Sequence, residues 1–351
     1  MHPHSRHPKS IVLLLVFIFI SLPLPMNAKS KDSEGLALLQ SEAKGGNLDA
    51  MAELGQWYWL GEEIRKDYKE SFKWYKKAAK KGHALSQARL GQHYVLGRGV
   101  KKDYGKSLKY FRQSADSGSK EGQYYLAKAY QLGIGVSKNE KKANQWMREA
   151  AKNNHMRAQV FLGLDYYKGE KGKSPDYNKA IYWFKKASSQ GDLEGKTFLG
   201  ILYTQFSSDS SHNQEGLKLL QQAANQGYPS AQHMLGALYL DAGPLVSPNP
   251  REGVAWIQKA AMQDHPPAQL QMATFYQKGV FVPRNLPRAY ASYQIVSKKD
   301  ESLKTGALKN LQAIKKEMSA KDIKTGEQIT KDWLKKHPVM VKDPLDPFKE
   351  L

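Results

Sequence analysis

A leucine or methionine that recurs about every 36 residues is the feature that most constrains the fold of this 351-residue chain. Each of these anchor residues is followed by Gly or Ala, and the residue four positions before it is always small. The anchors are Leu54, Leu90, Leu126, Leu162, Leu199, Leu235 and Met272. Self-similarity at such a period predicts a stack of repeated units, whereas the length alone suggests about two separate domains.

A tyrosine stands four residues after every anchor. These tyrosines are Tyr58, Tyr94, Tyr130, Tyr166, Tyr203, Tyr239 and Tyr276. Offsets of minus four, zero and plus four lie on one stripe of an α-helix, so the pattern predicts a helix with one packed face. On that face small residues such as Gly55, Gly91 and Gly163 allow a neighbouring helix to approach closely. We call this first helix of each repeat helix A.

A second helix, helix B, is predicted to begin about 17 residues after each anchor. Residues 71–79 show its pattern best, because an aromatic residue is followed four and five positions later by Ala-Ala. Residues that favour a left-handed backbone follow each B helix and are expected to end it. They are Gly46, Gly82, Gly118, Asn154, Gly191, Gly227 and Asp264.

The pattern changes at both ends of the stack. Residues 29–45 match a B helix alone and predict a capping half-repeat, which precedes seven repeats over residues 46–297. Residues 298–337 predict a helical cap for the C-terminal end, with a capping box formed by Ser319 and Asp322. Three prolines in residues 338–351 predict a flexible tail.

Two stretches carry a resemblance to a known family. Residues 91–100 read GQHYVLGRGV and residues 74–82 read WYKKAAKKG, and both resemble the Sel-1-like repeat, a relative of the tetratricopeptide repeat. The resemblance covers about residues 33–337. It implies an all-α chain folded as a right-handed superhelical α/α solenoid of about seven repeats, with a role in protein binding. Residues 206–211 and 242–244 depart from the inter-helix motif and are expected to be soft points.

The N-terminus has the layout of a signal peptide. Residues 1–9 are basic, residues 11–22 form an apolar run, and Ala28 supplies the small residue before a cleavage site. We therefore predict removal of residues 1–28 and export to the periplasm or the exterior. An uncleaved membrane anchor is the alternative, because Met26 is larger than usual at its position. No other segment is apolar enough to cross a membrane.

A search for chemistry finds no catalytic constellation. The pairs Gly97/Gly99 and Gly133/Gly135 follow no strand and complete no phosphate-binding motif, so they are interpreted as turns. The ten histidines lack metal-ligand spacing, and the chain has no cysteine. We predict a protein that is not an enzyme and has neither metal nor cofactor. An enzyme-like binder of cell-wall or β-lactam compounds is the alternative.

The face of helix A opposite its packed stripe is the candidate binding surface. Offsets of minus five, minus two, plus two and plus five lie there, and resemblance to tetratricopeptide repeats implies that this face lines a concave groove. The predicted groove residues are Trp59, Gln92, Tyr124, Lys128, Gln131, Arg157 and Tyr167. Charges on this face cancel, which favours a protein or peptide ligand. The alternative for Trp59 and Tyr167 is that they only pack along the inner wall.

The net charge of +21 is carried mostly elsewhere, by lysine pairs on the B helices, the loops and the C-terminal cap. Removal of residues 1–28 takes away two cations and leaves +19. A nucleic-acid ligand is not expected, because its groove would be basic. The basic outer surface leaves peripheral contact with an anionic membrane or cell wall as an alternative. Resemblance to bacterial Sel-1-like repeat proteins implies an adaptor in the envelope or outside the cell, which in some members controls cell-wall enzymes and in others promotes host entry or trafficking. We expect such an adaptor to be a monomer.

Overall fold

The computed structural model describes residues 28–61, 63–169, 174–206, 209–241, 245–338 and 345–348. These ranges hold 17 α-helices and one 3-10 turn, with no strand among them. Of the predicted signal peptide only Ala28 is included, as the first residue of α1, so that prediction lies outside the described residues. No helix in the described part of the chain has the length and apolar character needed to span a bilayer.

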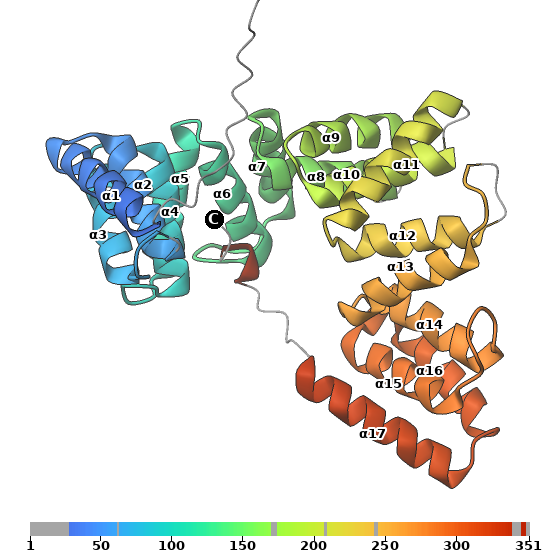
Figure 1. The fold of residues 1–351 in the computed structure, drawn as a ribbon. Helices are drawn as coiled ribbons and strands as arrows, with labels where there is room; N and C mark the ends of the chain where they lie inside the picture. The colour runs from blue at the N-terminus through green and yellow to red at the C-terminus, as the bar shows by residue number, and fades with distance from the viewer. Residues whose placement is uncertain are drawn as a thin grey trace, which may run out of the picture.

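The helices pair in chain order and stack into a curved solenoid (Figure 1). Helix α1 (Ala28–Gly45) comes first. The A helices are α2 (Leu48–Leu60), α4 (Ala84–Leu96), α6 (Lys120–Leu132), α8 (Met156–Lys168), α10 (Leu193–Phe206), α12 (Pro229–Leu240) and α14 (Pro266–Lys278). The B helices are α3 (Tyr68–Lys80), α5 (Tyr104–Asp116), α7 (Glu140–Lys152), α9 (Tyr177–Ser189), α11 (Ser210–Asn225), α13 (Pro250–Met262) and α15 (Leu286–Lys299). The predicted all-α solenoid of about seven repeats is confirmed.

Where a glycine follows the anchor, it accommodates a large side chain of the following B helix. A Cβ atom added to Gly91 would lie 2.5 Å from the ring of Phe111, and one added to Gly163 would lie 2.5 Å from Phe184. The neighbouring anchor Leu90 is fully buried. The signature of small residue and leucine is therefore a packing requirement of the A–B pair, as the sequence predicted.

The backbone at the recurring tyrosine holds the loop between helices A and B. The carbonyl of Tyr94 accepts a hydrogen bond from the backbone N–H of Asp103 at 2.9 Å, and Tyr58 and Asp67 repeat this contact at 2.9 Å. The Asp103 side chain in turn accepts from the backbone N–H of Lys106, so it caps the N-terminus of α5. The tyrosine position thus joins the end of one helix to the start of the next.

The turns that follow the B helices have the predicted left-handed backbone. Values of φ between 63° and 104° occur at all seven positions. These are Gly46, Gly82, Gly118, Asn154, Gly191, Gly227 and Asp264. Glycine is the common choice there because it has no Cβ, and Asn and Asp tolerate the same region.

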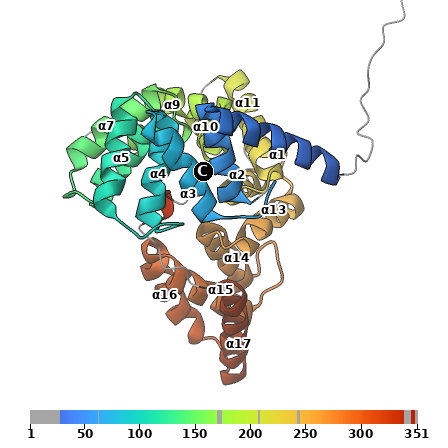
Figure 2. The same ribbon diagram turned by 90° about the vertical axis from the view of Figure 1, so that its left-hand side faces the viewer.

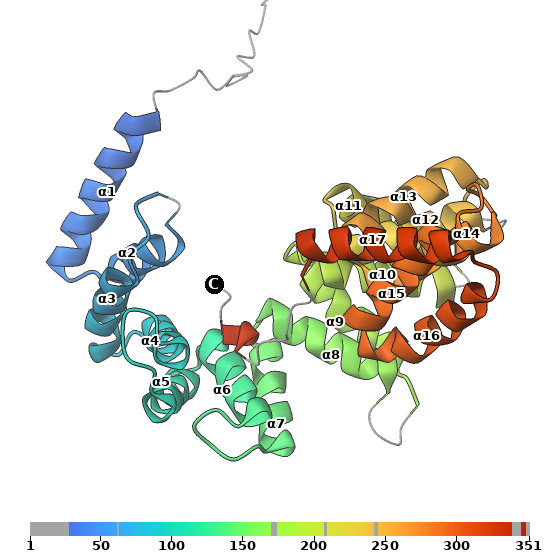
Figure 3. The same ribbon diagram turned by 90° about the horizontal axis from the view of Figure 1, so that it is seen from below.

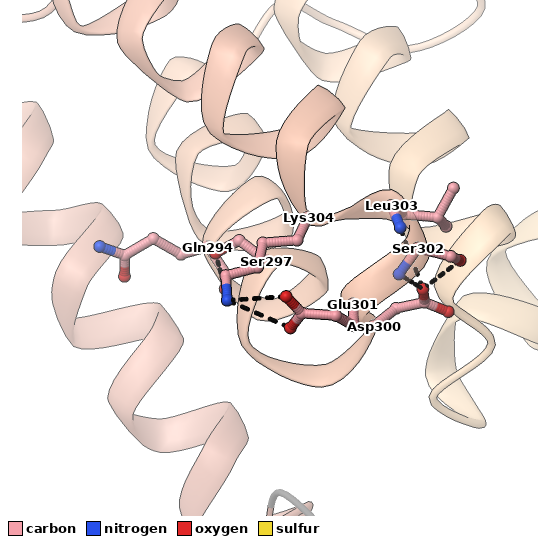
Figure 4. A network of polar contacts seen from close by, with 7 residues as sticks. All are labelled: Gln294, Ser297, Asp300, Glu301, Ser302, Leu303 and Lys304. Carbon is pink, nitrogen blue, oxygen red and sulfur yellow. Dashed lines mark hydrogen bonds and ion pairs between the residues drawn. The ribbon is translucent and has the colours of Figure 1, made fainter.

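Two further helices close the C-terminal end of the stack. Helix α16 (Glu301–Lys315) follows α15 through a tight turn in which the Asp300 carboxylate accepts from the backbone N–H groups of Ser302 and Leu303 at 2.8 and 3.0 Å (Figure 4). Helix α17 (Ala320–Lys336) begins with the capping box that the sequence predicts at Ser319 and Asp322. It packs along α15 and covers the end of the solenoid (Figure 2).

Asp264 joins this cap to the last repeat. Its carboxylate is 2.7 Å from Lys299 Nζ at the end of α15, 2.9 Å from Trp333 Nε1 of α17 and 3.1 Å from His337 Nδ1. Burial raises the pKa of Asp264, but hydrogen bonds from Lys299 and Trp333 and the Lys299 charge outweigh burial, so the net pKa is lowered. The carboxylate is therefore charged at neutral pH and holds three cap residues at once.

Candidate functional site

The inner side of the curve is lined by A helices. Helices α4 and α6, α8 and α10, and α10 and α12 pack directly against one another from repeat to repeat. The short turn η1 (Asp346–Phe348) lies on this inner side, against α4 and α6 (Figure 3). Binding positions on a solenoid of this kind depend on which side chains the A helices direct inward.

Two adjoining cavities open on this side between α4, α6, α8 and α10. The larger has a volume of about 340 Å³ and the smaller about 150 Å³, and both are lined by Tyr124 and Arg157. The larger is completed by Arg89, Lys120, Glu121, Tyr125, His155, Met156 and Gln190. The smaller is completed by Lys128, Met147, Val160, Phe161, Leu164, Asp192 and Glu194. The structure thus brings together three predicted groove residues: Tyr124, Lys128 and Arg157.

The ring of Tyr124, which is only 6% exposed, and the half-buried ring of His155 form a flat aromatic wall in the larger cavity. Their rings stack with centroids 4.2 Å apart and an interplanar angle of 15°. His155 Nδ1 accepts from the backbone N–H of Ala158 at 3.3 Å, so this histidine caps α8. Burial lowers the pKa of His155 to about 3, and the nearby charges of Lys120 and Arg89 act in the same direction. At neutral pH the ring is therefore uncharged.

The charge of the larger cavity comes from other side chains. Arg89, Lys120 and Arg157 line it together with Glu121, which leaves two excess positive charges on its lining. In the smaller cavity, burial and the neighbouring Asp192 raise the pKa of Glu194. The larger cavity therefore suits a ligand group that carries negative charge beside an aromatic or apolar surface.

Trp59 and Tyr167 lie outside these cavities. Trp59 is only 4% exposed. Its ring contacts Tyr68 and His93 at centroid distances of 5.3 and 4.9 Å, and the Arg98 guanidinium lies 4.7 Å from the ring centroid. Because Trp59 lines neither cavity and is surrounded by these side chains, it fits the alternative in which it only packs along the inner wall.

Tyr167 and Gln131 are also placed by the structure. Tyr167 is half-buried against Tyr177 and Phe198, at centroid distances of 5.9 and 5.6 Å. Gln131 is exposed and accepts from Lys128 Nζ at 2.9 Å. Tyr167 therefore belongs to the packing of repeats four and five, whereas Gln131 orients a residue that lines the smaller cavity.

Gln92, the remaining predicted groove residue, belongs to a site that is already occupied. Its side chain is fully buried, and its amide Nε2 donates to the Tyr125 hydroxyl at 2.7 Å and to the Phe348 carbonyl at 2.9 Å. The Phe348 ring is fully buried against Phe111 and Tyr125, at centroid distances of 5.6 and 5.9 Å. Residues 345–348 of the predicted flexible tail thus pack against the solenoid, and residues 339–344 and 349–351 lie outside the described residues.

Arg89 and Tyr125 are two of the site residues that the sequence reasoning missed. Both stand immediately before an anchor, a position that lies about 100° from the packed stripe and was not counted in the groove face. The structure places them in the seam between α4 and α6, where successive A helices approach. One feature of the sequence could have indicated this position. The residue before the anchor differs in type from repeat to repeat, for example Glu53 and Phe161, while the anchor and the tyrosine stay nearly constant.

The other histidine and glycine candidates have structural roles. His93 is buried, its Nδ1–H donates to the Arg98 carbonyl at 2.6 Å, and its Nε2 lies 3.1 Å from Ser71 Oγ. Gly99 and Gly135 have φ of 71° and 69° in turns between helices. Within the described ranges no group of three or more His, Asp or Glu side chains is placed to hold a metal ion.

Comparison with solved structures gives matching folds. A protective antigen present in uropathogenic Escherichia coli strains, displaying an SLR fold, is 29% identical with a TM-score of 0.71, over 85% of this chain and 63% of that one. This chain thus spans less than two thirds of that protein. A Sel1 repeat protein from Oxalobacter formigenes is 21% identical with a TM-score of 0.61, over 70% of this chain and 96% of that one. No curated protein matches this chain.

The model of the Sel1 repeat matches seven segments that together cover more than half of the chain. They are residues 48–83, 84–119, 120–155, 157–192, 210–228, 229–265 and 266–293. Sel1 repeats form a scaffold fold, and proteins that contain them generally mediate protein–protein interactions. With matching repeats, matching helix pairs and a solved neighbour of the same fold, this chain belongs to the Sel1 repeat family.

Proposed function

We propose that this protein is a scaffold that binds an extended segment of a partner protein along the inner face of α4, α6 and α8. The observation that carries the proposal is the larger inner cavity, where the stacked rings of Tyr124 and His155 lie beside Arg157. Aromatic residues and arginine are the side chains that most often dominate the energy of protein interfaces. An inner wall of A helices presents them to a segment that runs along the stack.

The charge of the cavity narrows the chemistry of the partner. Two excess positive charges favour a segment that carries a carboxylate next to an apolar or aromatic residue. Arg157 is exposed at the edge of the cavity and can meet such a carboxylate from solvent. The basic residues of the outer B helices do not enter this interaction.

Exchanging Arg157 for glutamate tests the proposal. We expect the Arg157→Glu variant to recover at least about tenfold less partner than the unchanged chain in native-cell crosslinking with mass spectrometry, since the cavity loses its attraction for a carboxylate. Arg251→Glu on the outer helix α13 is the matched control, because Arg251 is also exposed. Equal recovery with both variants, each shown by circular dichroism to be folded, would count against the inner face as the binding surface.

Export is part of the proposal. The basic and apolar N-terminal pattern supports it, and so does the 29% identity to a protective antigen of uropathogenic strains. Exported, the scaffold would act on cell-wall enzymes or at the host interface. We expect the mature protein to begin at Lys29 and to fractionate with the periplasm or the medium. N-terminal sequencing of protein from the native cell checks this expectation, and an intact N-terminus in the cytosolic fraction would contradict it.

A further inference from the structure

The turn η1 is held by helices that lie far from it in sequence. Gln92 and Phe348, which share a hydrogen bond, are 256 residues apart in the chain. In Figure 1 the turn lies beside α6, while α17, the helix that precedes it, stands at the far end of the curve. The segment therefore packs on the inner face of the solenoid rather than on its own neighbours in sequence.

We propose that the pocket of Gln92, Phe111 and Tyr125 is a peptide-binding site for a phenylalanine, and that this chain's own segment Leu345–Phe348 is its resident ligand. The pocket is aromatic on two sides. The Phe348 ring lies nearly parallel to Phe111, at an interplanar angle of 17°, and at 27° to Tyr125. Aromatic rings in these orientations pack best against a flat aromatic side chain. A phenylalanine provides such a side chain, whereas a branched aliphatic residue does not.

The polar contact of the pocket recognises the peptide backbone. Arg89 donates to Gln92 Oε1 at 2.9 Å and to the Tyr125 hydroxyl at 3.1 Å, which fixes the orientation of the Gln92 amide. The amide nitrogen of Gln92 is thereby directed at the Phe348 carbonyl. A backbone carbonyl is common to every peptide, so the aromatic walls select the side chain while Gln92 fixes the register.

The shape of the ligand is a tight turn. The backbone N–H of Phe348 donates to the Leu345 carbonyl at 2.9 Å, and Leu345 packs against the same hydrophobic cluster. Pro347, directly before the phenylalanine, restricts the backbone and lowers the entropy lost on docking. The ligand class is therefore a Leu-x-Pro-Phe segment, which the chain itself carries at residues 345–348.

The resident segment is placed to compete with a partner. Arg89 and Tyr125 contribute to the Phe348 pocket and also line the larger cavity. Resting on the proposed function, this overlap means that a partner segment that extends from the cavity toward α4 must displace η1. A ligand on a short tether has an effective concentration on the order of millimolar. If a free peptide of the same sequence binds the pocket with a Kd of about 0.1 mM, the effective concentration of the resident segment is about ten times this Kd. Competition by the resident segment then weakens the apparent binding of the free peptide about tenfold.

The experiment uses the full chain and a labelled peptide with the sequence of residues 343–351. We expect the Phe348→Ala protein, whose pocket is vacated, to bind this peptide about tenfold more tightly than the unchanged protein in fluorescence anisotropy. A peptide with alanine in place of its phenylalanine should bind neither protein. Leu345→Ala should shift peptide affinity in the same direction by a smaller factor, and Phe206→Ala, at an exposed phenylalanine of α10, should behave like the unchanged chain. Adding Gln92→Ala to Phe348→Ala should weaken binding about fivefold.

Three outcomes would overturn the proposal. The first is absence of peptide binding to a folded Phe348→Ala protein, and the second is equal affinity for that variant and the unchanged chain. The third is a concentration-dependent dimer of the unchanged chain that Phe348→Ala abolishes, because the segment would then dock on a second copy. Partner capture that depends on Arg157 while the peptide fails to bind would reject this proposal alone and leave the proposed function standing.

Discussion

Replacing Gly99 by alanine is expected to lower the free energy of unfolding by at least about 3 kcal/mol, for two separate reasons. Gly99 has a φ of 71°, which side chains with a Cβ rarely adopt. A Cβ added there would also lie 2.0 Å from the carbonyl oxygen of Tyr68, which opens α3 of the preceding repeat. The clashing atom belongs to the backbone, so no side-chain rotation can relieve the clash. The first and second repeats must therefore move apart at this contact.

The matched control is Gly118→Ala. Gly118 has a similar φ of 79°, but a Cβ added there would meet no atom within 4 Å. We expect it to cost only about 1 kcal/mol, the strain of the left-handed backbone. Urea denaturation gives both values, and hydrogen exchange should show faster opening of α3 and α4 in the Gly99 variant, since repeat stacks lose stability locally. Equal losses of stability for the two variants would show that Gly99 does not pack tightly against the backbone of Tyr68.

Acidification from pH 7 to pH 5.5 is expected to lower the stability of the protein by about 3 kcal/mol. Burial lowers the pKa of His93 to about 4 and, aided by nearby cations, that of His155 to about 3. In the unfolded chain both groups have the ordinary value near 6.5, so the unfolded state binds more protons as the pH falls. Stability is therefore fully present above pH 6.5 and is lost progressively below it, down to the folded pKa values.

The size of this effect follows from the pH difference. One unit below the ordinary pKa, each histidine that stays neutral in the folded state costs about 1.4 kcal/mol. His265, whose pKa burial also lowers, is more exposed and adds less. Urea denaturation at pH 7.0 and 5.5 measures the difference, and His155→Gln should reduce it by about 1.4 kcal/mol. A free energy of unfolding that is the same at both pH values would contradict the neutral, buried state of these side chains.

The repeat architecture could be predicted from the sequence because its determinants are local. An anchor such as Leu90, the glycine after it and the tyrosine four residues later lie within one helical turn or two of each other. Their packing partner, such as Phe111, lies in the next helix along the chain. The same contacts between residues that are close in sequence occur in every repeat. The period alone therefore predicts the helices, the turns and the stacking of the repeats.

The inner surface was harder to predict because its contacts depend on how successive A helices tilt toward each other. Tyr125 faces the seam with α4 although its offset lies outside the groove face. Trp59, at an expected groove offset, instead packs against Arg98 and Tyr68. Both outcomes are set by neighbouring repeats and by loop residues, which a helical wheel of one repeat does not contain.

The docking of Phe348 could not be inferred from local pattern at all. Its segment belongs to no repeat and is rich in proline, features that predict a flexible tail when they are considered alone. The pocket that holds it requires Gln92 of one repeat, Phe111 of its B helix and Tyr125 of the next repeat. Only the assembled solenoid brings these three residues together.

Site-specific photocrosslinking in the native cell tests the central claim most directly. A photoreactive residue at Met156, which lines the larger inner cavity, is expected to capture a partner protein, and the crosslinks should map to one contiguous segment of that partner. The same residue at Tyr182, which is exposed on the B helix α9, should capture that partner no more than background. Capture from Tyr182 with none from Met156 would contradict an inner face that binds an extended protein segment.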